Sequence, residues 1–156
     1  MSDATLWNLD ALRKTRQSLG PLFDRLSPEA WHAVPDGFRN NALWNVGHVA
    51  VTADLLTYGL AGLDVPAPRE AVAAFRKGTS PADWSEAPDV GATRQFFDTG
   101  IDRLEADYRA GRFETFRAYT TTPGVRLASV DEAIAFNVYH EGLHCGALLA
   151  LWKLVR

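Results

Sequence analysis

The chain has 156 residues, nearly half of them apolar and under a quarter charged, so we expect a single domain over residues 1–156 with an ordinary buried core. The net charge of −3 and the lack of a Lys/Arg cluster on any predicted helix face argue against a nucleic-acid partner. No apolar run is long enough to span a bilayer, no signal peptide is recognisable, and the single cysteine, Cys145, favours a reducing cytoplasm as the location.

The N-terminal part predicts one long helix and one short one. Leucines recur at steps of three and seven, which indicates an amphipathic helix over about residues 3–19. Gly20-Pro21 is expected to break it, because proline has no N–H and clashes with the preceding turn. Ser27-Pro28 then starts a short helix, with serine as the cap and proline at the first helical position. His32, in this short helix, is expected at the surface.

A second long helix is expected over about residues 41–60, with Asn40 or Asn41 as its cap. Apolar residues there alternate at steps of four and three, which predicts one stripe facing the core. The stripe consists of Trp44, His48, Val51, Leu55 and Tyr58. A solvated histidine is not expected on such a face, so His48 is a candidate metal ligand.

The middle of the chain is a long connection followed by a third long helix. Residues 62–88 are rich in Pro, Gly and Ser, with one short helix expected at about 70–76. A connection of this length can travel the length of a bundle, so the long helices that it joins need not be antiparallel. The third long helix is expected over about 89–108. Residues 112–127 contain a threonine run and a Pro-Gly pair, which suit a small hairpin.

The last helix begins at a capping box, with Ser129 at the cap and Glu132 three residues on, and is expected to run to the end of the chain. Its predicted inward stripe is Ala133, Asn137, His140, His144, Ala147, Leu151 and Leu154. Four long amphipathic helices predict an all-α fold, specifically a four-helix bundle with a long crossover between its second and third helices.

Three histidines on these core faces suggest a metal site. His140 and His144 lie one helical turn apart, with Cβ atoms about 6 Å from each other, so their imidazoles can share one ion. His48 on a facing helix would supply a third ligand, and three neutral imidazoles suit zinc, nickel or iron while leaving positions open for water or substrate. The alternative is that each histidine is a core residue hydrogen-bonded to a neighbour. Convergence of three of the chain's four histidines favours the metal.

The same segment matches a protease pattern. In zincins the glutamate of His140-Glu141-x-x-His144 would act as general base on a metal-bound water. No Glu or His follows His144 to complete such a site, and the chain offers little sheet to bind an extended peptide, so peptidase is a minor alternative. Glu141 is therefore interpreted either as a catalytic carboxylate near the metal water or as a carboxylate at the core boundary.

Two neighbours of the histidines need separate interpretation. Asn137 lies one turn before His140 and is either a hydrogen-bonding group for a ligand or substrate, or a polar residue at the mouth of the bundle. Cys145 directly follows His144, but one helical step rotates a side chain by about 100°. Cys145 is therefore expected to point away from the site as a small core residue.

The chain resembles the DinB-like superfamily of metal-binding four-helix bundles, which includes bacillithiol- and mycothiol-dependent enzymes. The resemblance rests on two segments, Asn45-Val46-Gly47-His48-Val49 and Tyr139-His140-Glu141-Gly142-Leu143-His144-Cys145-Gly146, and on the long crossover. It implies an up-down-down-up bundle, often dimeric, in which His48, His140 and His144 bind zinc or nickel and water completes the coordination. It also implies transfer of a low-molecular-weight thiol to an electrophile or, in one branch, isomerisation.

These observations together lead us to expect a divalent-metal-dependent transferase that adds a low-molecular-weight thiol to a small-molecule electrophile. A cation with open positions lowers the pKa of a bound thiol or water, so a nucleophile exists at neutral pH. A non-catalytic metal-binding stress-response module and a metal-dependent hydrolase are the alternatives. We expect a homodimer, with no nucleic-acid or membrane partner.

Overall fold

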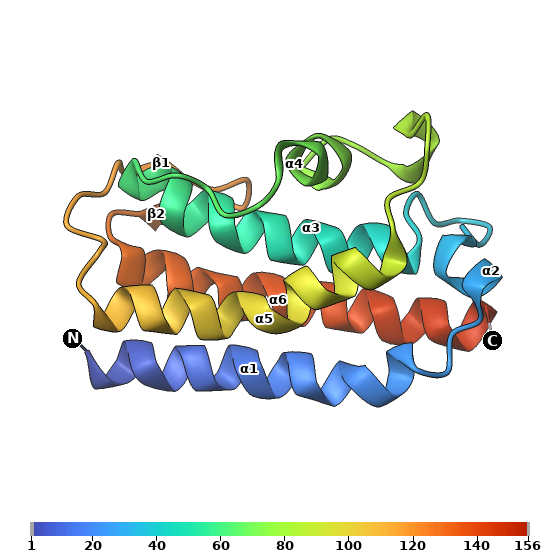
Figure 1. The fold of residues 1–156 in the computed structure, drawn as a ribbon, viewed down its shortest axis with the longest axis horizontal. Coiled ribbons are helices and arrows are strands. Elements are labelled where there is room, and N and C mark those ends of the chain that lie inside the picture. The colour runs from blue at the N-terminus through green and yellow to red at the C-terminus, as the bar shows by residue number, and fades with distance from the viewer. Residues whose placement is uncertain (1, 156) are drawn as a thin grey trace.

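The computed structural model describes residues 2–155, and its mostly helical structure confirms the all-α class (Figure 1). The long helices are α1 (Asp3–Phe23), α3 (Ala42–Asp54), α5 (Val90–Arg109) and α6 (Val130–Val155). The shorter ones are α2 (Pro28–His32), the π-helical turn η1 (Leu55–Gly59), α4 (Arg69–Phe75) and the 3₁₀ turn η2 (Pro81–Asp83). Strands β1 (Tyr119–Thr120) and β2 (Arg126–Leu127) form an antiparallel hairpin, with Tyr119 opposite Leu127.

The four long helices lie side by side in two opposite directions. α1 and α6 run one way and α3 and α5 the other, as the colour gradient of Figure 1 shows. α1 packs against α5 and α6, and α3 packs against the same two helices from the other side. The connection between η1 and α5 returns along α3 before α5 begins, which is why these two helices can be parallel (Figure 1).

α3 is buried on all sides. Every residue from 41 to 51 is buried, although the apolar pattern predicts a single inward stripe. The extra burial comes from α2 and α4, which pack on α3 in addition to α5 and α6. The helix that carries His48 is therefore enclosed by the crossover as well as by the bundle.

Two hydrophobic clusters fill the interior. One contains the large side chains of Phe23, Trp31, Phe75 and Phe97, and the other contains Leu12, Tyr58, Ile101 and Ile134. Each fully buried side chain of this size contributes roughly 1.5–3 kcal/mol relative to an exposed one. Each cluster contains side chains from several helices, so its packing holds the long helices together.

The expected break at Gly20-Pro21 is wrong, because α1 continues through Pro21 to Phe23. Pro21 lies within one turn of the helix end, so the missing N–H removes a single hydrogen bond from the last turn. Leu19 and Phe23, on either side of it, are buried in the larger cluster. Packing of these side chains holds the last turn in place.

The predicted inward stripe of α6 is wrong at its end, where Leu154 is 59% exposed. A strict repeat of three and four residues drifts by about 20° per heptad on a straight helix, so three heptads carry the stripe about 60° round the axis. The most deeply buried positions of α6 are Ala133, Ile134, Asn137, Glu141, Leu148 and Leu151, of which Ala133, Asn137 and Leu151 belong to the predicted stripe. His140 and His144 lie beside this face, on the side towards α3.

Other local predictions are confirmed. The Ser27 hydroxyl accepts a hydrogen bond from the Ala30 N–H at the start of α2, and the Asn41 side chain caps α3 by accepting from the Trp44 N–H. His32 is exposed. Within residues 2–155, no helix combines the length and hydropathy needed to cross a bilayer.

Candidate metal centre

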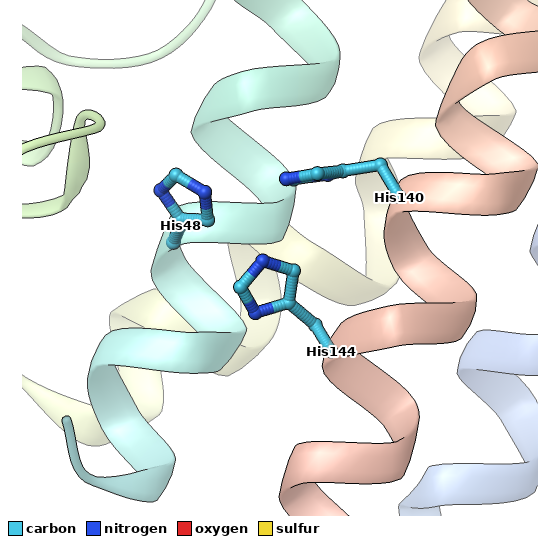
Figure 2. A group of neighbouring side chains, drawn as sticks. All are labelled: His48, His140 and His144. Carbon is cyan, nitrogen blue, oxygen red and sulfur yellow. The ribbon is translucent and has the colours of Figure 1, made fainter. Parts of the chain in front are cut away.

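His48 of α3 meets His140 and His144 of α6 in the interior of the bundle (Figure 2). Ring centroids lie 5.1 Å apart for His48 and His140, 4.8 Å for His48 and His144, and 4.7 Å for His140 and His144. One ring nitrogen from each residue lies within 4.8 Å of the other two. The structure therefore brings together the three histidines that helical spacing predicts on facing stripes.

The spacing of these nitrogens suits one ion after a small closure. An equilateral triangle with the largest observed side, 4.8 Å, has its centre about 2.8 Å from each corner, whereas a Zn–N bond is about 2.0–2.1 Å. Each ring nitrogen would move inwards by about 0.7–0.8 Å, which small side-chain rotations can provide. Of the described His, Cys, Asp and Glu side chains, these three form the group that can hold a metal.

His48 is oriented by contacts on both sides of its ring. Its Nδ1 lies 2.7 Å from the carbonyl oxygen of Phe75, at the end of α4. A carbonyl only accepts, so Nδ1 carries the proton and Nε2 keeps its lone pair for a ligand. Trp44 stacks on the ring at a centroid distance of 4.4 Å and an interplanar angle of 10°. The hydrogen bond to the Phe75 carbonyl is of the kind that fixes the tautomer of a metal-binding histidine.

His144 is oriented by a chain of two asparagines. Its Nδ1 lies 2.8 Å from Oδ1 of Asn45, one turn before His48 on α3. The amide orientation of Asn45 is set by its Nδ2, which donates to the Asn41 carbonyl at 2.8 Å. Oδ1 must then accept from the His144 Nδ1–H, which again leaves Nε2 free for a ligand.

His140 lacks such a partner among the described residues. Its Nδ1 is buried and makes no hydrogen bond. Asn137, one turn earlier on α6, is 0% exposed, and neither its Oδ1 nor its Nδ2 has a partner in residues 2–155. Asn137 is therefore not a polar residue at the mouth of the bundle. Buried polar groups without partners cost free energy, and functional sites are where native proteins tolerate them.

The three histidines are neutral at physiological pH. Burial is the largest cause: it lowers the pKa of His48, and together with repulsion from the other histidines it lowers the pKa of His140 to about 3 and that of His144 to about 4. A metal ligand must present an unprotonated nitrogen, so the site is ready to bind a cation at pH 7 without first losing protons.

Glu141 lies on a different side of α6 from the histidines. It is 2% exposed and forms an ion pair with Arg16 of α1, whose Nε donates to both carboxylate oxygens at 3.1 and 3.2 Å. The Arg16 guanidinium also donates to the Phe97 carbonyl of α5. Glu141 is thus not at the core boundary, and its contacts join α6 to α1 and α5.

Cys145 behaves as a small core residue. It is half-buried and packs against the larger hydrophobic cluster. Burial and the nearby Glu141 carboxylate raise the pKa of its thiol to about 11. A thiol with that pKa is protonated at neutral pH, so Cys145 is not an activated nucleophile.

A cavity of about 580 Å³ opens beside the histidines. His48 and His140 form part of its wall, and neither Asn137 nor Glu141 lines it. Most of the remaining wall near the site comes from the end of α3, from η1 and from α6, with Leu55, Leu56, Phe136 and Leu143 as its apolar part. This volume falls within the range of small-molecule sites, which are mostly apolar with a few polar groups.

Several contributors to the site have little or no signal in the sequence. The Phe75 carbonyl belongs to the backbone, so its contact with His48 cannot be predicted from a residue type. The contact of Arg16 with Glu141 depends on how α1 packs on α6, which the sequence does not specify. Asn45 did carry a signal: together with Asn41 and His48 it interrupts an otherwise apolar stretch of buried helix.

Comparison with known protein families places the chain beside one described family. The family model described as the DinB superfamily matches residues 11–148, a range that contains all three histidines. Comparison with curated proteins finds no match.

Proposed function

The chain belongs to the DinB superfamily, and on this premise we propose that it is a divalent-metal-dependent enzyme that transfers a low-molecular-weight thiol to a small electrophile. The observation that carries the proposal is the convergence of three neutral histidines beside a cavity of about 580 Å³. We also infer that the four long helices form the up-down-down-up bundle of this family.

We propose His48, His140 and His144 as the ligands of the ion. Imidazole ligands suit zinc and nickel, and three of them leave coordination positions for other groups. A divalent cation held there supplies positive charge that favours thiolate over thiol at neutral pH. The apolar wall of the cavity would exclude water around the electrophile and hold it beside the ligands.

We assign Asn137 a supporting role. Its amide and the Nδ1 of His140 are buried one helical turn apart, and neither has a partner among the described residues. A hydrogen bond between them would orient His140 as Phe75 and Asn45 orient the other two histidines. A catalytic role for Glu141 stays a prediction; its contacts with Arg16 favour a contribution through the position of α6.

We further propose a homodimer in the cytoplasm, where low-molecular-weight thiols are kept reduced. Support for the dimer comes from the outer face of α6, where apolar side chains are exposed to solvent. Its large members away from the cavity are Leu149 and Leu154; Tyr139 and Leu143 are also exposed but line the cavity. Exposed apolar faces of this kind are typical of protein interfaces.

The first experiment is metal analysis of untagged protein by mass spectrometry. We expect about one divalent ion per chain in the wild type and in His32→Ala, the matched control at the exposed fourth histidine, and a large loss of metal in His140→Ala. Wild-type protein without metal, or equal metal in both variants, would contradict the metal site.

The second experiment tests turnover. Metal-loaded protein should consume mercaptoethanol and chlorodinitrobenzene together, forming a C–S bond as chloride leaves and the thiol proton passes to the buffer. His140→Ala should not do so, and His32→Ala should. A protein that holds the metal but consumes neither compound is the non-catalytic metal-binding module.

A further inference from the structure

The cavity beside the histidines carries two cationic side chains and no acidic one. Lys77, just after α4, and Arg117, before β1, both line it, and no Asp or Glu is part of its wall. The electrostatic field of these cations acts inside a concave, partly apolar enclosure, where an anion is held more strongly than on an open surface.

Neither cation is neutralised by the described part of the protein. Lys77 Nζ donates to the hydroxyl of Thr122 at 2.6 Å, and Arg117 is anchored through its backbone, whose N–H donates to the Leu60 carbonyl at 2.7 Å. The ion pairs within residues 2–155 leave out both side chains. The guanidinium and the ammonium therefore keep donors available for a ligand.

These cations come from different parts of the chain. Lys77 follows α4 in the crossover, whereas Arg117 and Thr122 belong to the segment that forms the hairpin. The Lys77–Thr122 hydrogen bond joins the two segments at the cavity wall. Two loops that are far apart in the sequence thus place positive charge on the cavity that His48 and His140 also line.

The rest of the cavity wall is mainly apolar. η1 contributes Leu55 and Leu56, and α6 contributes Phe136 and Leu143. The π-helical turn η1 is a wider turn than the α-helix that precedes it, and such turns recur at functional sites. A ligand that fits this enclosure combines an apolar body with a negative charge at one end.

We propose that the cavity binds an organic carboxylate with an apolar, preferably aromatic, body. The carboxylate lies at Lys77 and Arg117, and the apolar body extends along the wall towards His48 and His140. Arg117 suits this role because a guanidinium can donate two parallel hydrogen bonds to a carboxylate. That this ligand is the electrophile of thiol transfer rests on the proposed function; the anion site itself does not.

The test compares two probes of similar shape, the anionic chloronitrobenzoate and the neutral chloronitrobenzamide, binding to metal-free protein by calorimetry or NMR titration. The proteins are wild type, Lys77→Gln, Arg117→Gln and Arg126→Gln. Arg126 is an exposed arginine on β2 that does not line the cavity, so it is the matched control for lost charge. Metal-free protein excludes direct coordination of the carboxylate by an ion.

We expect wild type and Arg126→Gln to bind the benzoate about tenfold more tightly than the benzamide, as for one hydrogen bond to a charged group. Lys77→Gln and Arg117→Gln should each lose most of this preference and keep their affinity for the benzamide. Equal binding of the two probes by wild type, or an equal loss in Arg126→Gln, would overturn the anion site.

A kinetic comparison separates the two proposals. With mercaptoethanol as a neutral thiol, metal-loaded wild type should show a lower KM for the benzoate than for the benzamide. Arg117→Gln should raise the KM for the benzoate and leave the KM for the benzamide unchanged. Metal-loaded protein that turns over both probes with equal KM overturns the carboxylate ligand but not the transferase. A charge preference in metal-free protein without any turnover supports the anion site and contradicts the transferase.

Discussion

At the scale of single residues, the candidate centre depends on which ring nitrogen of each histidine is already engaged. The Phe75 carbonyl and the Asn45 side chain occupy Nδ1 of His48 and His144, so Nε2 of both remains for a ligand. Burial keeps all three rings neutral. A cluster of buried neutral histidines also has a consequence for the stability of the metal-free protein.

Metal-free protein should lose stability as the pH falls below the ordinary histidine pKa of 6.5. The folded-state pKa values of His140 and His144, about 3 and about 4, lie below this value, so the unfolded chain binds protons first. Their contribution is fully present above pH 6.5 and declines as the pH falls towards 4 and 3. Thermal melts across this range measure the effect.

The matched comparison for that prediction is the double variant His140→Gln with His144→Gln. Carboxylates titrate in the same pH range in both proteins, so the difference between the two melting profiles isolates the histidines. A smaller acid-induced loss of stability is expected in the double variant. Identical pH profiles would mean that these rings are not buried as described.

Glu141 should be more important for folding than its place beside His140 suggests. Glu141→Gln leaves the Arg16 guanidinium buried without its carboxylate, and breaking one side of a buried ion pair costs roughly 3 kcal/mol or more. Chemical denaturation should show this loss, while Glu114→Gln, at an exposed site, should be close to wild type. If Glu141 is a general base instead, the variant would unfold like wild type and lose only turnover.

Helical spacing and the two motif segments were sufficient to predict that His48, His140 and His144 come together. The surroundings of these residues were not predictable in the same way. One helical step separates His140 from Glu141, and that rotation of about 100° is enough to give one a place at the cavity and the other a place against Arg16. Partners from other elements become known only when the helices are packed.

At the scale of secondary structure, the packing of α4 on α3 links the crossover to His48. Phe75, whose carbonyl orients His48, rests its ring directly over Gly47. A Cβ added at Gly47 would lie 2.5 Å from the Phe75 ring, far inside van der Waals contact. Glycine at this position therefore permits the close approach of the two helices.

Gly47→Ala should weaken both folding and metal binding. Overpacking of this kind costs about 1–3 kcal/mol, and displacement of the Phe75 carbonyl removes a hydrogen bond of the type whose loss lowers metal affinity roughly tenfold or more. Titration of the metal-free variant with zinc measures the affinity. Gly20→Ala in α1, where an added Cβ meets nothing within 4 Å, is the control and should bind zinc like wild type. Unchanged affinity in Gly47→Ala would show that the carbonyl is not required.

The boundaries of the long helices were predictable, and their detailed geometry was less so. Capping residues and apolar periodicity located α5, α6 and the continuous stretch of α3 and η1 to within a few residues. Pro21 and η1 show the limit of local rules. Side-chain burial on both sides of Pro21 holds its turn helical, and the change from α to π geometry at Leu55 is not encoded by any one residue type.

At the scale of the whole molecule, α6 has two faces with different surroundings, one towards α3 and one towards solvent. One side presents His140 and His144 to α3, and the outer side is exposed and almost uncharged from Ala135 to Leu154, with Lys153 as its one charged residue. Gly142 and Gly146 on this outer side have open space around them. Such a surface lets a second helix approach closely, as the proposed dimer requires.

Leu149→Glu should convert the proposed dimer to a monomer, because a charge buried in an apolar interface without a partner is costly. Size-exclusion chromatography with light scattering should give the mass of two chains for wild type and of one chain for the variant. Val34→Glu, an equally drastic change at an exposed site after α2, should remain dimeric. A monomeric wild type would remove the dimer from the proposal.

The contact between His48 and the crossover passes through a main-chain oxygen. Any amino acid at position 75 offers that same acceptor, so the side chain there is constrained by the space over Gly47 and not by the hydrogen bond to His48. The partner of His144 is instead the side-chain amide oxygen of Asn45, so this hydrogen bond does depend on the residue type at position 45. Homologous chains could thus vary the length and composition of the crossover widely, provided that one backbone carbonyl returns to the same place.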